Sequence, residues 1–84
     1  AWNNKGFTLS ELKKYDEAIV LYDKALEIDP KYMGALYNKG LALANLEKFE
    51  EAIVCYDRVL EIDPNNKKII KDRQLAVDAA KLDK

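Results

Sequence analysis

The chain has 84 residues, of which 49% are hydrophobic and 35% are charged, and its formal net charge is −1. A chain of this length forms one domain, which buries roughly 60–65% of the surface it exposes when unfolded. The near-neutral, interleaved charge argues against a generic nucleic-acid surface. No apolar run approaches the roughly 18–20 residues that a membrane span needs.

The residue types absent from the chain limit its chemistry. Histidine is absent, which removes imidazole bases and the commonest metal ligand. The single cysteine, Cys55, lies in a helical pattern beside Tyr56, so we expect a packed apolar side chain. No other constellation suggests catalysis, so we expect a protein that is not an enzyme, with no cofactor and no metal site. Residues 1–9 lack a signal-peptide pattern, and we expect a cytoplasmic location.

Apolar stripes at helical spacing predict five helices. Trp2, Gly6, Leu9 and Leu12 form the first stripe, at spacings of four, three and three. Proline disfavours a helical residue before it and suits the first helical turn after it, so Pro30 is predicted to separate two helices. The expected helices lie near residues 1–12, 16–29, 31–46, 50–63 and 66–82.

The chain repeats itself with a period of 34 residues. Residues 1–32 and 35–66 are identical at 18 of 32 positions without a gap, which indicates a tandem duplication. Glycine recurs in mid-helix, where it costs about 0.5–1 kcal/mol relative to alanine. We therefore expect close helix packing there: Gly6 and Gly40 should approach the small residues Ala18 and Ala52, with Tyr22 and Tyr56 beside them.

The series Trp2-x2-Lys5-Gly6-x2-Leu9…Ala18-x3-Tyr22…Pro30 resembles the tetratricopeptide repeat, and the series from Leu36 to Pro64 resembles it again. The resemblance covers roughly residues 1–66 and implies an all-α, right-handed solenoid of antiparallel helix hairpins. We expect one domain with repeats at 1–32 and 33–66 and a solvating helix at 67–84. Some positions depart from the family pattern: Lys5 and Lys39 replace leucine, Leu9 and Leu43 replace tyrosine, and Lys13 and Glu47 replace a turn glycine.

The resemblance implies a protein–protein interaction scaffold that holds an extended peptide in a concave groove formed by the first helix of each unit. From the helical stripe, the first unit should contribute Asn3, Asn4, Phe7, Ser10 and Glu11. The second unit and the last helix should contribute Tyr37, Asn38, Leu41, Asn45, Lys68, Lys71, Asp72 and Leu75.

Two side-chain types make this groove a candidate site. Asn4 and Asn38 recur at the period, and a carboxamide matches the donor and acceptor of a peptide bond. The alternative is that these carboxamides form hydrogen bonds within the array or with water. Phe7, Tyr37 and Leu41 are apolar on a face that should meet solvent. They indicate contact pockets, or else packing between repeats or ordinary surface exposure.

Some relatives hold chaperone C-termini in a carboxylate clamp. Lys68 and Asn38 match two clamp positions, whereas Asn3, Phe7 and Asp72 replace the lysine, asparagine and arginine of the others. A complete clamp is not expected.

The alternative function is structural. The first helix lacks a capping residue, so the chain is expected to be a piece of a longer protein or a designed array. Its N-terminal end would then expose apolar surface, and self-association through that end is possible. In that case the main partner is a second copy of the chain.

Overall fold

The computed structural model describes residues 2–82, except for the Trp2 side chain, so the packing predicted for Trp2 lies outside the described residues. Residues 2–82 contain no strand, as predicted. The helices are α1 (Trp2–Glu11), α2 (Tyr15–Ile28), α3 (Met33–Asn45), α4 (Phe49–Ile62) and α5 (Lys67–Leu82). The all-α solenoid of antiparallel hairpins is confirmed.

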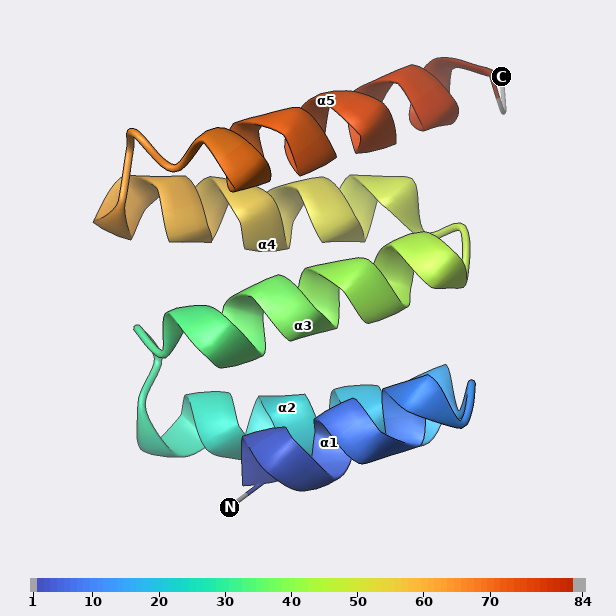
Figure 1. Cartoon of the computed structure of the whole chain (residues 1–84), viewed down its shortest axis with the longest axis vertical. Helices are drawn as coiled ribbons and strands as arrows, with labels where there is room; N and C mark the ends of the chain where they lie inside the picture. The colour runs from blue at the N-terminus through green and yellow to red at the C-terminus, as the bar shows by residue number, and fades with distance from the viewer. Residues whose placement is uncertain (1, 83–84) are drawn as a thin grey trace.

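The helices stack in chain order. Each packs on the next one along the chain, and α1 also touches α3. Figure 1 shows α1 lying against α2 at one end of the stack and α5 covering α4 at the other. The helices α1, α3 and α5 occupy corresponding places, because each begins a repeat or the segment that follows the repeats. No helix within residues 2–82 is long and apolar enough to cross a bilayer.

The recurring glycines lie against the tyrosine rings predicted beside them, and none of the three nearest atoms at either glycine belongs to Ala18 or Ala52, the residues that they were predicted to approach. A Cβ atom on Gly6 would lie 2.6 Å from Cε1 of Tyr22, and one on Gly40 would lie 2.6 Å from Cε1 of Tyr56. Both tyrosine rings are fully buried, at 0% and 2% exposure. Since a ring in the core has little room to move, each glycine makes space for its tyrosine.

Each hairpin turns at a residue with left-handed backbone geometry. Lys13 and Glu47 both have φ of 62°. They stand where the family pattern commonly has glycine, and the geometry explains that preference, because an L-residue in this region is strained by roughly 1–2 kcal/mol.

Lys13→Gly and Glu47→Gly should therefore each raise the free energy of unfolding by about 0.5–1 kcal/mol, which is the relieved strain less the entropy that glycine gains when unfolded. Urea denaturation gives the change. The matched control is Lys14→Gly, because Lys14 has a φ of −95° and no strain to relieve. A Lys13→Gly protein no more stable than the Lys14→Gly protein would contradict the assignment.

The helix predicted near residues 31–46 begins two residues later than expected, at Met33. Asp29 is extended, with φ −138° and ψ 94°, and ends α2. Its carboxylate accepts a hydrogen bond from the Lys31 backbone N–H at 3.1 Å, and its carbonyl accepts one from the Tyr32 N–H at 3.0 Å. These bonds form a turn around Pro30, so α3 starts only at Met33.

The last helix covers the end of the second repeat. Ile69 and Ala76 are buried, at 3% and 4% exposure, in the same core cluster as Tyr56 and Val59 of α4. Asn66 caps the helix by accepting a hydrogen bond from the Ile69 N–H at 3.2 Å.

Candidate functional site

Two hollows open on the side formed by α1, α3 and α5. The first, of about 160 Å³, lies between α1 and α3 and is lined by Phe7, Glu11, Asn38, Leu41 and Asn45 among others. The second, of about 290 Å³, lies between α3 and α5 and is lined by Leu41, Phe49, Asp72, Leu75 and Ala79 among others. Leu41 borders both hollows. We call these two hollows together the groove.

The apolar residues of the groove are partly open to solvent. Phe7 is 50% exposed and Leu75 is 58% exposed, while Leu41 is half-buried. Phe7 and Leu41, predicted as contact residues, line the groove together. Tyr37 does not line either hollow; its ring tilts against Tyr56 with centroids 6.4 Å apart.

Asn3 and Asn38 form a hydrogen-bonded chain inside the array. Asn3 is 9% exposed, and its Nδ2 donates to the Tyr32 hydroxyl at 3.2 Å. The Nδ2 of Asn38 donates to Oδ1 of Asn3 at 3.2 Å. The carboxamide of Asn3 is thus used within the fold, whereas Asn38 also lines the groove and keeps its Oδ1 as an acceptor.

The other predicted polar residues differ in position. Asn4 is exposed, and no described hydrogen bond involves its carboxamide, but it borders neither hollow. Asn45 lines the first hollow and donates to the Leu41 carbonyl at 2.9 Å. Ser10 lines it too, but shares a 3.0 Å hydrogen bond with the Tyr22 hydroxyl. Burial raises the pKa of that tyrosine and the bond to Ser10 lowers it.

Lys68, Tyr37 and Asp72 gather beside the second hollow. The Nζ of Lys68 lies 4.7 Å from the centroid of the Tyr37 ring, a cation–π arrangement. Burial raises the pKa of Tyr37, with Lys68 lowering it and Asp72 raising it. Burial also raises the pKa of Tyr56, and Asp72 adds to that shift. The Oδ2 of Asp72 is buried and accepts no hydrogen bond from any described residue.

Lys71 is exposed and borders neither hollow. Of the two lysines predicted at the groove, Lys68 lies over the Tyr37 ring and Lys71 lies outside both hollows, while Asp72 lines the second hollow. This arrangement does not converge several cations on one point, as binding of a terminal carboxylate would need.

The tetratricopeptide repeat profile matches residues 1–32 and 34–66, which together make up most of the chain. The chain belongs to the tetratricopeptide repeat family. A similar solved structure is the first TPR of Spaghetti (RPAP3) bound to the HSP90 peptide SRMEEVD, with 26% sequence identity and a TM-score of 0.58. The similarity covers 94% of this chain and 90% of that one. No curated protein sequence matches the chain.

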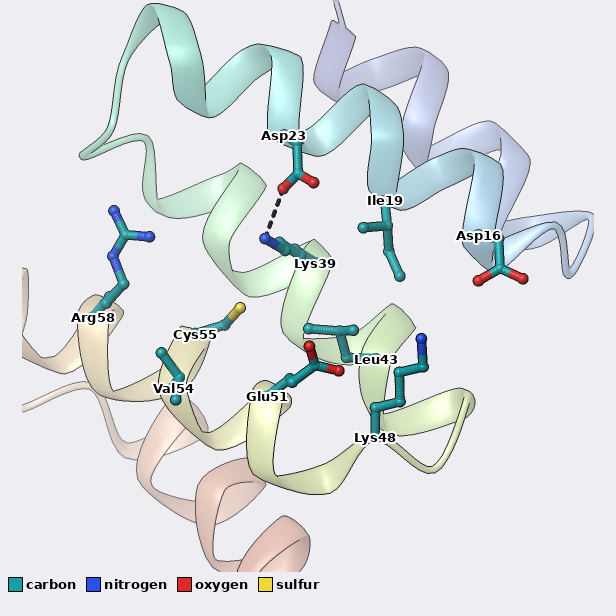
Figure 2. Close-up of a pocket in the computed structure, with 10 residues that line it drawn as sticks. All are labelled: Asp16, Ile19, Asp23, Lys39, Leu43, Lys48, Glu51, Val54, Cys55 and Arg58. Carbon is teal, nitrogen blue, oxygen red and sulfur yellow. Dashed lines mark ion pairs between the residues drawn. The ribbon is translucent and has the colours of Figure 1, made fainter.

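Sequence reasoning missed a further hollow on the opposite side of the tetratricopeptide repeats. It has a volume of about 360 Å³ and lies between α2 and α4, with α3 as its floor. Figure 2 shows side chains of both charges around it, among them Asp16, Glu51 and Lys48. Ile19, Leu43 and Cys55 supply its apolar part.

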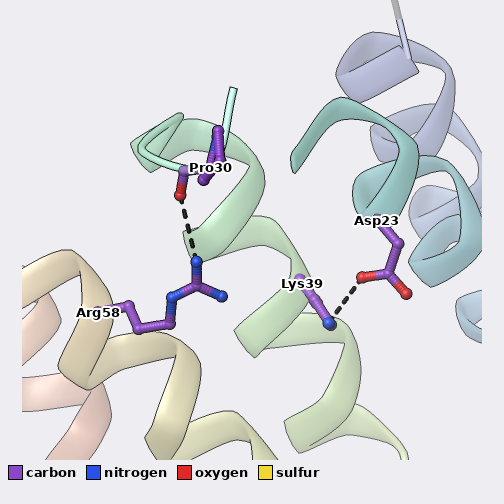
Figure 3. Close-up of polar contacts among 4 residues, drawn as sticks. All are labelled: Asp23, Pro30, Lys39 and Arg58. Atoms are coloured by element: carbon purple, nitrogen blue, oxygen red, sulfur yellow. Dashed lines mark hydrogen bonds and ion pairs between the residues drawn. The ribbon is translucent and has the colours of Figure 1, made fainter. Parts of the chain in front are cut away.

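Polar contacts at this hollow connect the two repeats. Lys39 of α3 pairs with Asp23 of α2 at 2.6 Å, and the Arg58 guanidinium donates to the Pro30 carbonyl at 3.4 Å (Figure 3). The Lys39–Asp23 pair recurs 34 residues later as the ion pair of Arg73 with Asp57. The period itself was the signal that could have revealed these pairs. Their recurrence identifies them as contacts that hold successive units together.

Cys55 is packed, as predicted. It is 5% exposed, and burial raises the pKa of its thiol, which keeps the sulfur protonated and unreactive. Within residues 2–82, no group of three or more His, Cys, Asp or Glu side chains is placed to hold a metal ion.

Proposed function

We propose that this chain is a protein-interaction module that binds an extended segment of a partner protein in the groove formed by α1, α3 and α5. The observation that carries the proposal is the pair of adjoining hollows that share Leu41. Tetratricopeptide repeats are a non-catalytic protein-interaction fold, and the similar Spaghetti domain is bound to a peptide. Both facts support a peptide ligand.

We propose as contact residues those that line the two hollows of the groove. Phe7, Glu11, Asn38, Leu41 and Asn45 line the first hollow, while Asp72 and Leu75 line the second. Asn4, Lys68 and Lys71 are proposed as contacts at the edge, and Asn3 as the residue that orients Asn38. The HSP90 peptide of the relative is not proposed as the ligand, because Asn3, Phe7 and Asp72 stand at clamp positions.

Selection of peptides from a random dodecapeptide library displayed on phage tests the proposal. Selected peptides should shift the amide resonances of α1, α3 and α5 in a nitrogen–proton NMR spectrum. Leu41→Lys should weaken binding at least about ten-fold, since a charge would occupy the ridge between two apolar hollows. The control is Val54→Lys, because Val54 is 58% exposed and borders the opposite hollow.

Two results would contradict groove binding. One is a selection that enriches no peptide above a blank surface. The other is a selected peptide whose affinity falls with Val54→Lys but not with Leu41→Lys.

Self-association remains the alternative proposal. Directly after α1, Leu12 is 62% exposed, whereas the equivalent Leu46, directly after α3, is more covered. Such exposed apolar surface favours contact with a second copy. Sedimentation equilibrium of the protein used for selection distinguishes the two functions, because a peptide-binding module should keep a monomer mass at every concentration.

A further inference from the structure

One face of α4 carries an exposed apolar stripe with a cation at its centre. Val54, Arg58 and Ile62 follow one another at intervals of four residues, so they lie on the same side of the helix, about 6 Å apart along its axis. Val54 is 58% exposed and Ile62 is 38% exposed. Because these side chains are open to solvent, the stripe is accessible to a partner.

Two adjoining hollows follow this stripe. The hollow between α2 and α4 is lined by Val54 and reaches Arg58, which Figure 2 shows on the same helix. A second hollow, of about 540 Å³, begins at Arg58 and is lined by Pro30, Lys31, Leu36, Glu61 and Ile62 as well. Both are larger than either hollow of the groove. We call these two hollows together the α4 trough.

The α4 trough suits a helix better than an extended segment. Helices α2 and α4 wall its first hollow and α3 forms the floor, and side chains of a further helix can pack into a furrow of this kind. Ile19, Leu43 and Leu36 in the lining offer no side-chain partner to a peptide backbone. Since residues 2–82 contain no strand, they have no sheet edge for an extended segment, whereas a helix pairs its own backbone.

Arg58 gives the trough its selectivity. Within residues 2–82 its one described acceptor is the Pro30 carbonyl, 3.4 Å from a guanidinium nitrogen (Figure 3). This distance is longer than the roughly 2.7–3.2 Å of most N–H···O hydrogen bonds. A guanidinium has five N–H donors and binds a carboxylate through two parallel bonds. A carboxylate in the trough would therefore replace a weak contact with a stronger one.

The acids of the trough limit which anionic partners it accepts. Glu51 borders the first hollow and Glu61 the second, and neither takes part in the described ion pairs. Their charges repel a run of acidic residues, a nucleic acid or an anionic membrane surface. One acidic residue between two apolar ones matches the stripe, because Arg58 lies between Val54 and Ile62.

We propose that the α4 trough binds an amphipathic helix of a partner protein. The helix carries one aspartate or glutamate, with a large apolar residue about one turn before it and another about one turn after it. The carboxylate pairs with Arg58, and the apolar side chains pack against Val54 and Ile62. This surface lies apart from the groove, so the inference goes beyond the proposed function and does not rest on it.

The first repeat supplies a matched control for this surface. The stripe recurs on α2 as Val20, Lys24 and Ile28, each 34 residues before its equivalent on α4. Val20 is 55% exposed, much like Val54. None of the three α2 residues lines either hollow of the trough. Substitutions on α2 therefore repeat the chemical change at a similar exposure without touching the proposed site.

Phage selection with the Leu41→Lys protein as bait tests the proposal, since this variant disables the groove. A random hexadecapeptide library is long enough to form about four helical turns. Enriched peptides should carry the acidic residue between two apolar ones, and an acetylated and amidated consensus peptide should gain helical circular dichroism on binding. Val54→Lys should weaken binding at least about ten-fold, whereas Val20→Lys should change it less than about two-fold.

The acidic residue of the peptide tests Arg58. Exchanging it for glutamine should weaken binding to the bait at least about five-fold, the effect of losing a bidentate ion pair. Adding Arg58→Gln to the bait should reduce this preference to less than about two-fold, while Lys24→Gln should leave it unchanged. Arg58→Glu should bind a peptide with lysine in place of the acid better than the original peptide. Thermal melts of these variants show that the fold is kept.

Several outcomes would overturn the proposal. They are a selection that enriches nothing above a blank surface, equal losses with Val54→Lys and Val20→Lys, and peptides that gain no helicity or carry a run of acids. An unchanged preference in Arg58→Gln would remove the role of Arg58. A bait that dimerises in sedimentation equilibrium and becomes monomeric with Val54→Lys would identify a second copy as the occupant. All these results leave groove binding intact, because selection on the wild-type protein tests it separately.

Discussion

Gly40→Leu should lower the free energy of unfolding by about 3 kcal/mol or more, at the upper end of the cost of overpacking a core. The melting temperature should fall by roughly 12–24 °C for a domain of this size. The reason is steric. Even a single Cβ atom on Gly40 would lie 2.6 Å from Cε1 and 3.0 Å from Cδ1 of the Tyr56 ring. That ring is 2% exposed and cannot swing out to solvent.

Two substitutions control for effects other than the clash. Lys39→Leu adds the same side chain one residue earlier and removes a partly exposed ion pair with Asp23, which should cost less than about 1 kcal/mol. Gly34→Ala adds a Cβ atom 3.0 Å from Cε1 of Tyr32, whose side chain is 38% exposed and held only by the hydrogen bond from Asn3 to its hydroxyl, so it should cost less than Gly40→Leu. Urea melts in which Gly40→Leu and Lys39→Leu share a midpoint would refute the packing role of Gly40.

The sequence predicted this contact because it repeats. A glycine in mid-helix costs stability, and one that recurs after 34 residues in register with an alanine and a tyrosine has a packing reason. The same register gave the five helices and the groove side of α1 and α3. Features that follow from the period and from helical geometry were therefore predictable, including the positions of Phe7, Asn38 and Leu41 at the first hollow.

Features that depend on turn geometry were not predictable in this way. The helical stripe placed Asn3 in the groove, but its carboxamide bonds to Tyr32, which is 29 residues away in the turn before α3. That turn is fixed by the Asp29 side chain, which delays the start of α3 to Met33. A periodic pattern gives the face of a helix on which a residue lies, but not which partner a neighbouring loop brings to it.

The hollow between α2 and α4 escaped prediction for a different reason. This hollow depends on the distance between α2 and α4, the second helices of the two repeats. The apolar pattern of either helix does not predict that distance. Cys55 of α4 lines this hollow, and its equivalent in the first repeat is Leu21, so the 34-residue period does not reproduce this lining. The ion pair of Asp23 with Lys39 could have been predicted only from the recurrence of the same charges 34 residues later, at Asp57 and Arg73.

The last helix, α5, has two structural roles, and a substitution at a buried position of this helix can test both. It covers the buried residues of α4, and it supplies one wall of the groove through Asp72, Leu75 and Ala79. Ala76 joins both roles: it is 4% exposed in the core cluster and also lines the second hollow. Its equivalent in α3, Ala42, is 1% exposed and packs with Ala18 and Tyr22.

Ala76→Arg should therefore detach α5 and lower the free energy of unfolding by about 1–3 kcal/mol, because the long side chain overpacks the contact between α5 and α4. The cost stays below that of an unpaired buried charge, since Asp72 of the second hollow can pair with the guanidinium. Hydrogen exchange should show lost protection in α5 before α1 to α3, and affinity for groove peptides should fall with it. The control is Gln74→Arg, which places the same side chain on an exposed position of the same helix. If both variants kept wild-type protection and affinity, α5 would be neither a cap nor a wall. If Ala76→Arg lost protection in α5 but kept full affinity, the ligand would rest on α1 and α3 alone, and the second hollow would have no part in binding.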